Sequence, residues 1–261
     1  MQDMPSNAPS SIHVLSLNLR FGLADDGPNR WEQRRSALAP LLSAWPCDFY
    51  GFQEANDFQI EFLAELLPDY GLIGRRFPAP PFWQNNILFF HRRWQNLASE
   101  HFFLSPTPDL PSRFRQSRWP RQCTLGIFRQ GQRHLICVNT HFDFKTSIQT
   151  RSAELICQRL MGQASTWPAI LMGDFNAGPQ SPCYRVFTTI PSAGGPGFRN
   201  TQQPPYSGTH HGFSGKSQDE PIDWILYRGD LAASGAGVIQ NRFAGYYPSD
   251  HFPLHAELAF L

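Results

Sequence analysis

Residues 170–179 of the chain read ILMGDFNAGP, and their interpretation decides the fold. Ile170 to Met172 form an apolar run typical of a buried strand, but the run stops at Gly173 and is followed by Asp174 and Asn176. Aspartate and asparagine are common turn residues, so one interpretation is a simple turn. The other is that the strand delivers both polar side chains to an active site.

Other apolar segments also end or begin at polar residues. These are Asn18 ending IHVLSLN, Glu54 after DFYGFQ, Asn139, His141 and Asp143 after HLICV, and Asp250 and His251 just before the last apolar segment. Because ligands bind at the ends of strands in α/β proteins, we expect these side chains to surround one crevice. Taken singly, each is explained more simply as a turn, a helix cap or a surface histidine. A chance occurrence of all these polar residues together, and in this order along the chain, is improbable.

The types of side chain in this set indicate a metal site. Glu54, Asp174 and Asp250, with Asn18 and Asn176, offer oxygen ligands and no thiolate. Such ligands suit Mg²⁺, with Mn²⁺ as a substitute, better than zinc. A hard cation beside a phosphate group polarises phosphorus and offsets charge on the leaving oxygen, so metal-assisted phosphate ester hydrolysis is the chemistry predicted.

Two histidines add proton chemistry to this set. Because side chains alternate along a strand, His141 shares a face either with Asn139 or with Asp143, and it is placed to donate to a phosphate oxygen. Asp223, in PIDWIL, is a candidate partner that fixes the tautomer of His251. The simpler alternative pairs Asp223 with an arginine.

Strands outnumber helices in the periodicity of the chain. The strands expected are 12–18, 47–55, 85–93, 124–130, 134–140, 168–173, 222–227, 237–243 and 253–260. Helices are expected from a capping box at Asn29–Glu32, over 57–67 and over 146–163, and loops over 104–121 and 191–221. This mixture predicts two packed sheets with helices outside, as one domain over 11–261 behind a mobile tail at 1–10.

Bulk composition narrows the class of protein. The 22 Lys and Arg residues balance 21 Asp and Glu residues, which disfavours binding driven by bulk phosphate neutralisation. The five cysteines contain no C-x-x-C, so they fit a reducing compartment rather than a disulfide framework. The first residues, MQDMPSNAPS, lack the features of a signal peptide, and we expect a cytoplasmic monomer with no membrane span.

The motifs together resemble the endonuclease/exonuclease/phosphatase superfamily, the pancreatic-DNase-like hydrolases, and in particular its compact bacterial members of unassigned substrate. The motifs are LSLNLRFG, GFQEA, NTHFD, GDFNAGPQSP, IDWIL and PSDHFPL, which run from about residue 12 to the C-terminus. The resemblance implies a four-layer α/β/β/α sandwich and divalent-metal-dependent cleavage of a phosphate ester. One departure is His210, where an aromatic residue is more usual.

The resemblance also implies roles for individual residues. Glu54 binds the metal, with Asn18 and Asp250 close by, and water attacks in line without a covalent intermediate. It implies five catalytic residues. Asp174 orients or deprotonates the attacking water, and Asn176 positions the water or the phosphate. His251, supported by Asp223, stabilises the transition state, and His141 donates to the same phosphate group.

The substrate is less well defined than the chemistry. In RFRQSRWPR, Arg118 and Arg121 favour phosphate binding, whereas the neighbouring arginines fit a solvated loop. His211 and Asp143 complete the substrate-binding candidates. We expect a phosphodiesterase or phosphatase. A nuclease acting on DNA or RNA, either a single-strand exonuclease or an endonuclease, is the less favoured alternative, and a catalytically dead phosphate-binding scaffold is less favoured still.

Overall fold

The computed structural model describes residues 11–162, 167–189, 197–217 and 220–261, so the predicted tail at 1–10 lies outside the described residues. The first sheet has the strand order β11-β12-β1-β2-β4-β3 and the second the order β5-β6-β7-β8-β10-β9. The strands of the first sheet are β1 (Ser11–Asn18), β2 (Phe49–Ala55), β3 (Tyr70–Ile73), β4 (Asn85–His91), β11 (Leu231–Val238) and β12 (Leu254–Phe260). Those of the second are β5 (Gln95–Phe103), β6 (Gln122–Gln130), β7 (Arg133–His141), β8 (Ala169–Asp174), β9 (Arg199–Asn200) and β10 (Asp223–Arg228).

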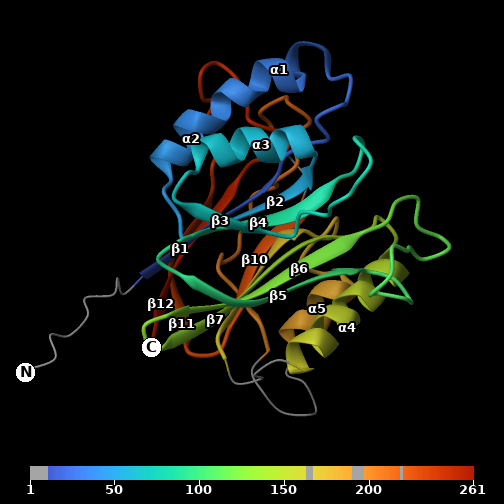
Figure 1. Ribbon diagram of the computed structural model, residues 1–261, viewed down its shortest axis with the longest axis vertical. Helices are drawn as coiled ribbons and strands as arrows, with labels where there is room; N and C mark the ends of the chain where they lie inside the picture. Colours follow the sequence, from blue (N-terminus) through green and yellow to red (C-terminus); the bar gives the residue numbers. More distant parts are fainter. Residues whose placement is uncertain (1–10, 163–166, 190–196, 218–219) are drawn as a thin grey trace, which may run out of the picture.

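Helices cover the outer face of each sheet, so the predicted four-layer α/β/β/α sandwich is confirmed (Figure 1). The helices on the first sheet are α1 (Trp31–Arg34), α2 (Leu38–Ala44) and α3 (Asp57–Leu66). Those on the second are α4 (Thr146–Gly162) and α5 (Pro182–Thr188).

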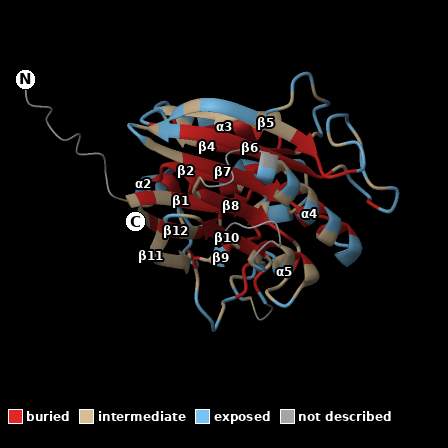
Figure 2. Ribbon diagram, turned by 90° about the horizontal axis from the view of Figure 1, so that it is seen from below, coloured by how far each residue is buried: buried red, intermediate tan, exposed pale blue. Residues whose placement is uncertain are grey.

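The main core lies between the two sheets. Phe49 of β2 meets Phe128 of β6 with ring centroids 4.9 Å apart, and Ile170 and Met172 of β8 belong to the same buried cluster. Every described residue of β8 is buried, because one face packs on the opposite sheet and the other lies under helices (Figure 2). The continuous apolar sequence of this strand follows from burial on both faces.

The strand pairing brings the polar residues to one edge. β1 and β2 are parallel, with Asn18 opposite Gln53, and β7 and β8 are parallel, with His141 opposite Asp174. β10 runs antiparallel to β8, so its first residue, Asp223, also lies opposite Asp174. Polar side chains from both sheets therefore meet where these parallel strands end.

Some predicted elements were wrong in position. The segment Gly27–Asn29 is a short 3₁₀ turn, and α1 begins after Arg30 without a side-chain cap, so Asn29 opens no capping box. The Gln59 side chain instead accepts a hydrogen bond from the Asn56 amide, 2.9 Å away, at the start of α3. The strand predicted at 237–243 ends at Val238, because β11 pairs with β12 only up to the Val238–Leu254 pair.

Short or exposed strands were missing from the prediction. β3 has four residues, β9 has two and lies within the segment predicted as loop, and the first five residues of β5 are mostly exposed. Among the described residues, no helix is both long enough and apolar enough to cross a membrane.

Candidate active site

Asp174 uses its two carboxylate oxygens for different purposes. Oδ1 accepts a hydrogen bond from the Asn176 amide, 2.9 Å away, while Oδ2 accepts one from Nδ2 of Asn18, 3.0 Å away. Asn176 has a left-handed backbone with φ of 47°, which asparagine tolerates well. The segment ILMGDFNAGP therefore forms an Asx turn, and the carboxylate of Asp174 also contacts Asn18, another of the predicted site residues.

Gly173 lets β8 approach its neighbour closely. A Cβ at this position would lie 2.0 Å from the carbonyl oxygen of Thr140 in β7. The glycine before Asp174 is thus required for packing, and it keeps the ends of β7 and β8 together.

Glu54 sits on a β-bulge. Between Phe52 and Ala55, β2 contains one residue more than the facing part of β4, and Glu54 has a left-handed φ of 58°. A bulge redirects side chains at the end of a strand, and such a backbone is costly for a residue other than glycine. The observed strain at Glu54 indicates that the direction of this side chain matters.

Asn139 stabilises the bulge from the opposite sheet. Its Nδ2 donates to the carbonyl oxygens of Phe52 and Ile87 at 2.9 and 2.7 Å, and its Oδ1 accepts from Nε2 of Gln53 at 2.6 Å. These carbonyl groups flank the point where the β2–β4 ladder changes register. Asn139 therefore ties the two sheets together directly behind Glu54.

The three predicted metal ligands lie around one loop. Glu54 accepts from Nδ2 of Asn18 at 3.2 Å and from the Phe21 amide at 2.7 Å. Asp250 lies beside Arg20, the residue before Phe21: its Oδ2 is 3.6 Å from Nε of that arginine. The carboxylates of Glu54 and Asp250 thus face adjacent residues of the segment after β1, and the site offers oxygen donors of the kind that hard cations prefer.

Asp223 and His251 form a buried pair. Nδ1 of His251 lies 2.9 Å from Oδ2 of Asp223, and its Nε2 lies 3.9 Å from Oδ2 of Asp174. Burial alone would disfavour the imidazolium, but the neighbouring carboxylates, Asp223 foremost, raise the pKa of His251 above that of a free imidazole. Burial, followed by the charge of Asp223, raises the pKa of Asp174 well above that of an ordinary aspartate.

His141 connects Asp174 to two further candidates. Its Nε2 is 3.4 Å from Oδ2 of Asp174, 3.2 Å from Nδ2 of Asn176 and 2.9 Å from Nη1 of Arg121. Burial lowers the pKa of His141 well below its usual value, and the charges of Arg121 and His251 lower it further. His141 is therefore a neutral imidazole surrounded by charged groups.

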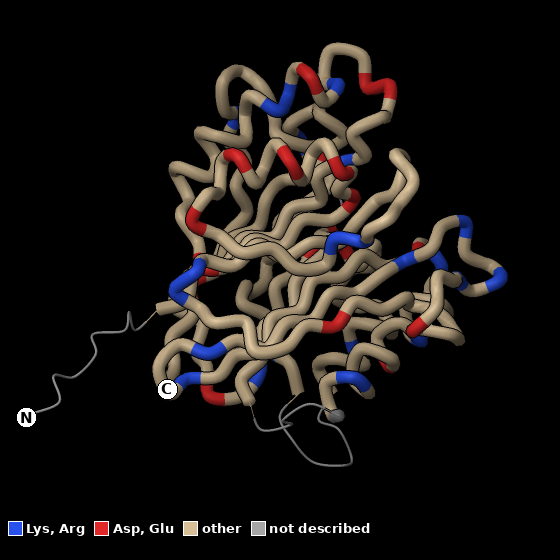
Figure 3. The backbone as a smooth tube through the Cα atoms, in the orientation of Figure 1, with Lys and Arg blue, Asp and Glu red and all other residues tan. Residues whose placement is uncertain are grey.

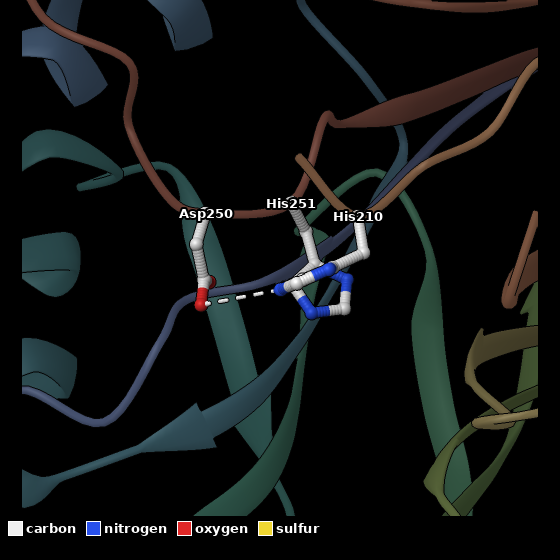
Figure 4. Close-up of side chains that lie close together, drawn as sticks. All are labelled: His210, Asp250 and His251. Atoms are coloured by element: carbon white, nitrogen blue, oxygen red, sulfur yellow. Dashed lines mark ion pairs between the residues drawn. The ribbon is translucent and has the colours of Figure 1, made fainter. Parts of the chain in front are cut away.

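His210 was not among the predicted site residues, yet it borders the site. Its Nε2 lies 3.9 Å from Oδ2 of Asp250, and its ring centroid lies 4.9 Å from that of His251 (Figure 4). Among the described residues, ligand atoms approach within 4.8 Å of one another in two groups that could hold a metal ion, namely His210–Asp250–His251 and Asp174–Asp223–His251. The sequence signal for His210 was its departure from the aromatic residue that is more usual at this position.

Arg34, the last residue of α1, was also missed. The side chain is fully buried and donates to the carbonyl oxygens of Leu19, Arg20 and Pro248. These bonds join the loop after Asn18 to the loop before Asp250. Arg34 therefore positions the two segments that hold the predicted metal ligands.

The predicted substrate-binding residues differ in burial and in their contacts with the catalytic candidates. Arg121 is buried and contacts His141, whereas Arg118 is exposed and packs its guanidinium 5.1 Å from the ring centroid of Trp119. Asp143 is buried, and its Oδ1 accepts from the Lys145 amide at 3.0 Å. Only Arg121 of these three makes a described contact with a catalytic candidate.

His211 packs within the protein instead of facing the catalytic candidates. Its ring stacks on Phe252 with centroids 3.9 Å apart and meets Tyr247 edge-on, and only 4% of the residue is exposed. Its Nδ1 accepts from the Gly215 amide. The expectation that the His211 side chain contacts substrate is corrected on this basis: the side chain supports the loop that precedes β12.

Comparison with known proteins agrees with this arrangement. Residues 15–251 match the sequence pattern of the Endonuclease/Exonuclease/phosphatase family. The chain belongs to this family. Solved structures of family members from Bacteroides thetaiotaomicron include a family protein with 27% identity, a TM-score of 0.85 and coverage of 97% of this chain and 99% of that one.

A second such structure is a mannosyl-6-phosphatase from the same bacterium, with 27% identity, a TM-score of 0.84 and coverage of 95% of this chain and 100% of that one. Mouse nocturnin is 23% identical over 98% of this chain and 67% of its own length. The family is one of phosphoester hydrolases, so this chain is a family hydrolase.

Proposed function

We propose that this protein is a divalent-metal-dependent hydrolase that cleaves a phosphate ester by in-line attack of water. The observation that carries the proposal is the position of Asp174 Oδ2. This oxygen lies 3.0 Å from Nδ2 of Asn18, 3.4 Å from Nε2 of His141 and 3.9 Å from Nε2 of His251. One buried carboxylate thus faces the amide of Asn18 and the imidazoles of His141 and His251. A base, a hydrogen-bond donor and a cation therefore lie within reach of one reacting group.

Asp174 is the proposed base for the attacking water. Its raised pKa brings a carboxylate closer to the range in which it can take up a proton at working pH. Asn176, whose backbone N–H donates a hydrogen bond to Asp174 Oδ1, directs its side chain towards His141. Asn176 therefore helps to orient the water or the phosphate.

His251 and His141 would stabilise the charge that develops on the phosphate oxygens. The Asp223 carboxylate favours the cationic form of His251, so this ring presents a positive Nε2 to the site. His141 stays neutral and acts as a hydrogen-bond donor. Donors that are fixed before the reaction stabilise a charged transition state without reorganising.

Glu54, Asn18 and Asp250 are the proposed holders of Mg²⁺, with Mn²⁺ as a substitute. All three offer oxygen, and the strained backbone at Glu54 aims a carboxylate into the site. The histidine-containing groups fit less well, because both include His251, and a protonated imidazole has no lone pair for a metal. A bound divalent cation would supply Lewis-acid polarisation of the phosphate and charge neutralisation.

A panel of phosphate esters tests this function. Purified wild-type protein is assayed with Mg²⁺ and with Mn²⁺ on bis-p-nitrophenyl phosphate, p-nitrophenyl phosphate, inositol phosphates and single-stranded RNA. We expect metal-stimulated release of phosphate or alcohol from at least one of them, and loss of that turnover in Asp174→Asn. Turnover that persists unchanged in Asp174→Asn would contradict the proposal.

A further inference from the structure

One carboxylate oxygen of Asp250 has no hydrogen-bond partner among the described residues. Oδ1 accepts from Oγ of Ser249 at 3.1 Å, whereas no residue that the structure describes donates a hydrogen bond to Oδ2. Asp250 is only 7% exposed, and a buried carboxylate oxygen normally has a donor or a cation beside it. Oδ2 is therefore available to bind a cation at the active site.

His210 faces this oxygen from another segment of the chain. Its Nε2 lies 3.9 Å from Oδ2 of Asp250, and Figure 4 shows the imidazole directed towards the carboxylate. This separation is too long for a hydrogen bond. Bonds from Zn²⁺ to an imidazole nitrogen or a carboxylate oxygen are about 2.0–2.2 Å long, so one such ion can reach both atoms. The gap between Nε2 and Oδ2 thus fits a single bound ion.

The backbone holds His210 in this position. His210 forms an isolated antiparallel bridge with His251, and the amide of His211 donates to the carbonyl oxygen of Asp250 at 2.8 Å. Both chain neighbours of His210 are buried, whereas its own side chain is 48% exposed. Among the described residues, neither ring nitrogen of His210 has a hydrogen-bond partner. A ligand nitrogen fixed by its backbone in this way loses little freedom when an ion binds.

The neighbouring cations do not take the place of such an ion. Nε of Arg20 lies 3.6 Å from Oδ2 of Asp250, but the guanidinium is bound to both carboxylate oxygens of Asp26, at 3.1 and 2.8 Å. His251 is protonated beside its own carboxylate partner, and an imidazolium has no lone pair for a metal. An ion at Oδ2 of Asp250 therefore takes its nitrogen ligand from His210.

The overall charge of the protein does not draw cations to this edge. The formal net charge is +1, and basic and acidic positions are interspersed along the chain (Figure 3). The choice of ion therefore depends on the local donors. Ligand sets made only of oxygen suit Mg²⁺, whereas an imidazole ligand favours later first-row ions such as Zn²⁺.

From this geometry we propose that His210 is a ligand of the divalent ion bound by Asp250, and that its nitrogen gives the site a preference for Zn²⁺-like transition ions over Mg²⁺. The inference rests on the proposed metal-dependent function and deepens it, because Glu54, Asn18 and Asp250 alone offer only oxygen. Removal of the His210 imidazole should therefore change which ion binds more than whether an ion binds.

Calorimetric titration of metal-free protein with Mg²⁺ and with Co²⁺, a spectroscopic substitute for Zn²⁺, tests the preference. His210→Phe keeps a ring of similar size but has no ligand atom. Its affinity for Co²⁺ should be about tenfold or more below that of the wild type, and its affinity for Mg²⁺ less than about threefold below.

Proton NMR of the Co²⁺-loaded protein shows the ligand itself. Ring protons of an imidazole bonded to Co²⁺ have large contact shifts, which require a bond to the ion. The wild type should show such resonances, and His210→Phe should lack them. His134→Phe is the matched control, because it removes a histidine of β7 whose ring stacks on Trp167 instead of facing Asp250. This control should retain both the resonances and the wild-type affinities.

The outcomes distinguish this inference from the function on which it rests. If His210→Phe binds both ions as the wild type does, and no contact-shifted resonance depends on His210, the ligand assignment is wrong and a metal site made only of oxygen stands. Equal losses for both ions in His210→Phe, with the contact-shifted resonances retained, would also overturn it, because they indicate general damage to the site. If neither ion binds the wild type, the proposed metal-dependent function is contradicted, and the inference falls with it.

Discussion

Nδ1 of His251 lies 2.9 Å from Oδ2 of Asp223, although 28 residues separate them in the chain. Asp223 begins β10, and His251 lies in the loop that leads into β12 of the other sheet. The pair therefore joins the two sheets at the edge where the strands carrying Asn18, Glu54 and Asp174 end. The structure thus brings together the two residues for which the sequence suggested that Asp223 fixes the tautomer of His251.

Asp223→Asn should impair turnover far more than folding. The substitution keeps the shape of the side chain but removes the charge that favours the His251 imidazolium, so kcat should fall by about 10²–10⁴-fold with a smaller change in KM. Steady-state kinetics and a thermal melt on the same preparation measure this. A variant that melts much earlier but turns over normally would show that Asp223 has a structural role only.

Asn139→Leu should destabilise the protein. The change removes the donors to the Phe52 and Ile87 carbonyl oxygens, and both lie in the buried space between the sheets. Each unsatisfied buried group costs about 1–3 kcal/mol, so the free energy of unfolding should fall by about 2–4 kcal/mol. Urea denaturation provides the measurement, with Asn96→Leu at a half-buried position of β5 as a comparison. Equal stability of Asn139→Leu and wild type would mean that the bulge needs no support from β7.

The contribution of His101 to the stability of the protein should decrease as pH falls below about 6.5, the ordinary pKa of histidine. Burial lowers the pKa of His101 in the folded state, where Nδ1 lies 2.9 Å from Oγ1 of Thr124. The unfolded chain therefore takes up the proton first, and folding free energy is lost as pH drops through the unfolded pKa towards the folded one.

His101→Gln tests the share of this effect that belongs to His101. The glutamine does not titrate, so the variant should lose less stability than the wild type between pH 7 and pH 5 in urea denaturation. His134→Gln is a suitable control, since it replaces a histidine of β7 whose ring stacks on Trp167 instead of contacting Thr124. Identical losses in His101→Gln and wild type would refute the assignment.

Much of the fold and of the site followed from the sequence, for physical reasons that individual residues illustrate. β8 was predictable because burial on both faces leaves an unbroken apolar run before Asp174. β5 was not, because its first half is exposed and its sequence, QNLASEHFF, lacks a regular apolar alternation. Two-residue β9 is held by pairing with β10, which no local pattern reveals.

The site shows the same division. Asn18, Glu54, Asp174 and His251 could be found because each follows or precedes an apolar strand, and strand ends converge in this architecture. The bulge that redirects Glu54 depends on its pairing with β4 and could not be read locally. His211 was misassigned because its stacking on Phe252 is a tertiary contact, and Arg34 was missed because nothing local shows that it is buried between two loops.

Glu54→Gln should weaken metal binding while leaving the fold in place. The amide keeps the size of the side chain but removes a charged oxygen donor, and hard cations bind neutral ligands less tightly. Calorimetric titration with Mn²⁺ should show a loss of affinity of about tenfold or more relative to wild type. Glu65→Gln, on an exposed turn of α3, controls for the change in net charge.

The most direct measurement is the initial rate of phosphate ester hydrolysis by wild-type protein, using a panel member that it cleaves, before and after removal of divalent ions. The proposed function predicts that the rate falls to background in EDTA and returns when Mg²⁺ is added in excess. Full activity in EDTA would contradict a metal held by Glu54, Asn18 and Asp250, and with it the mechanism built on these residues.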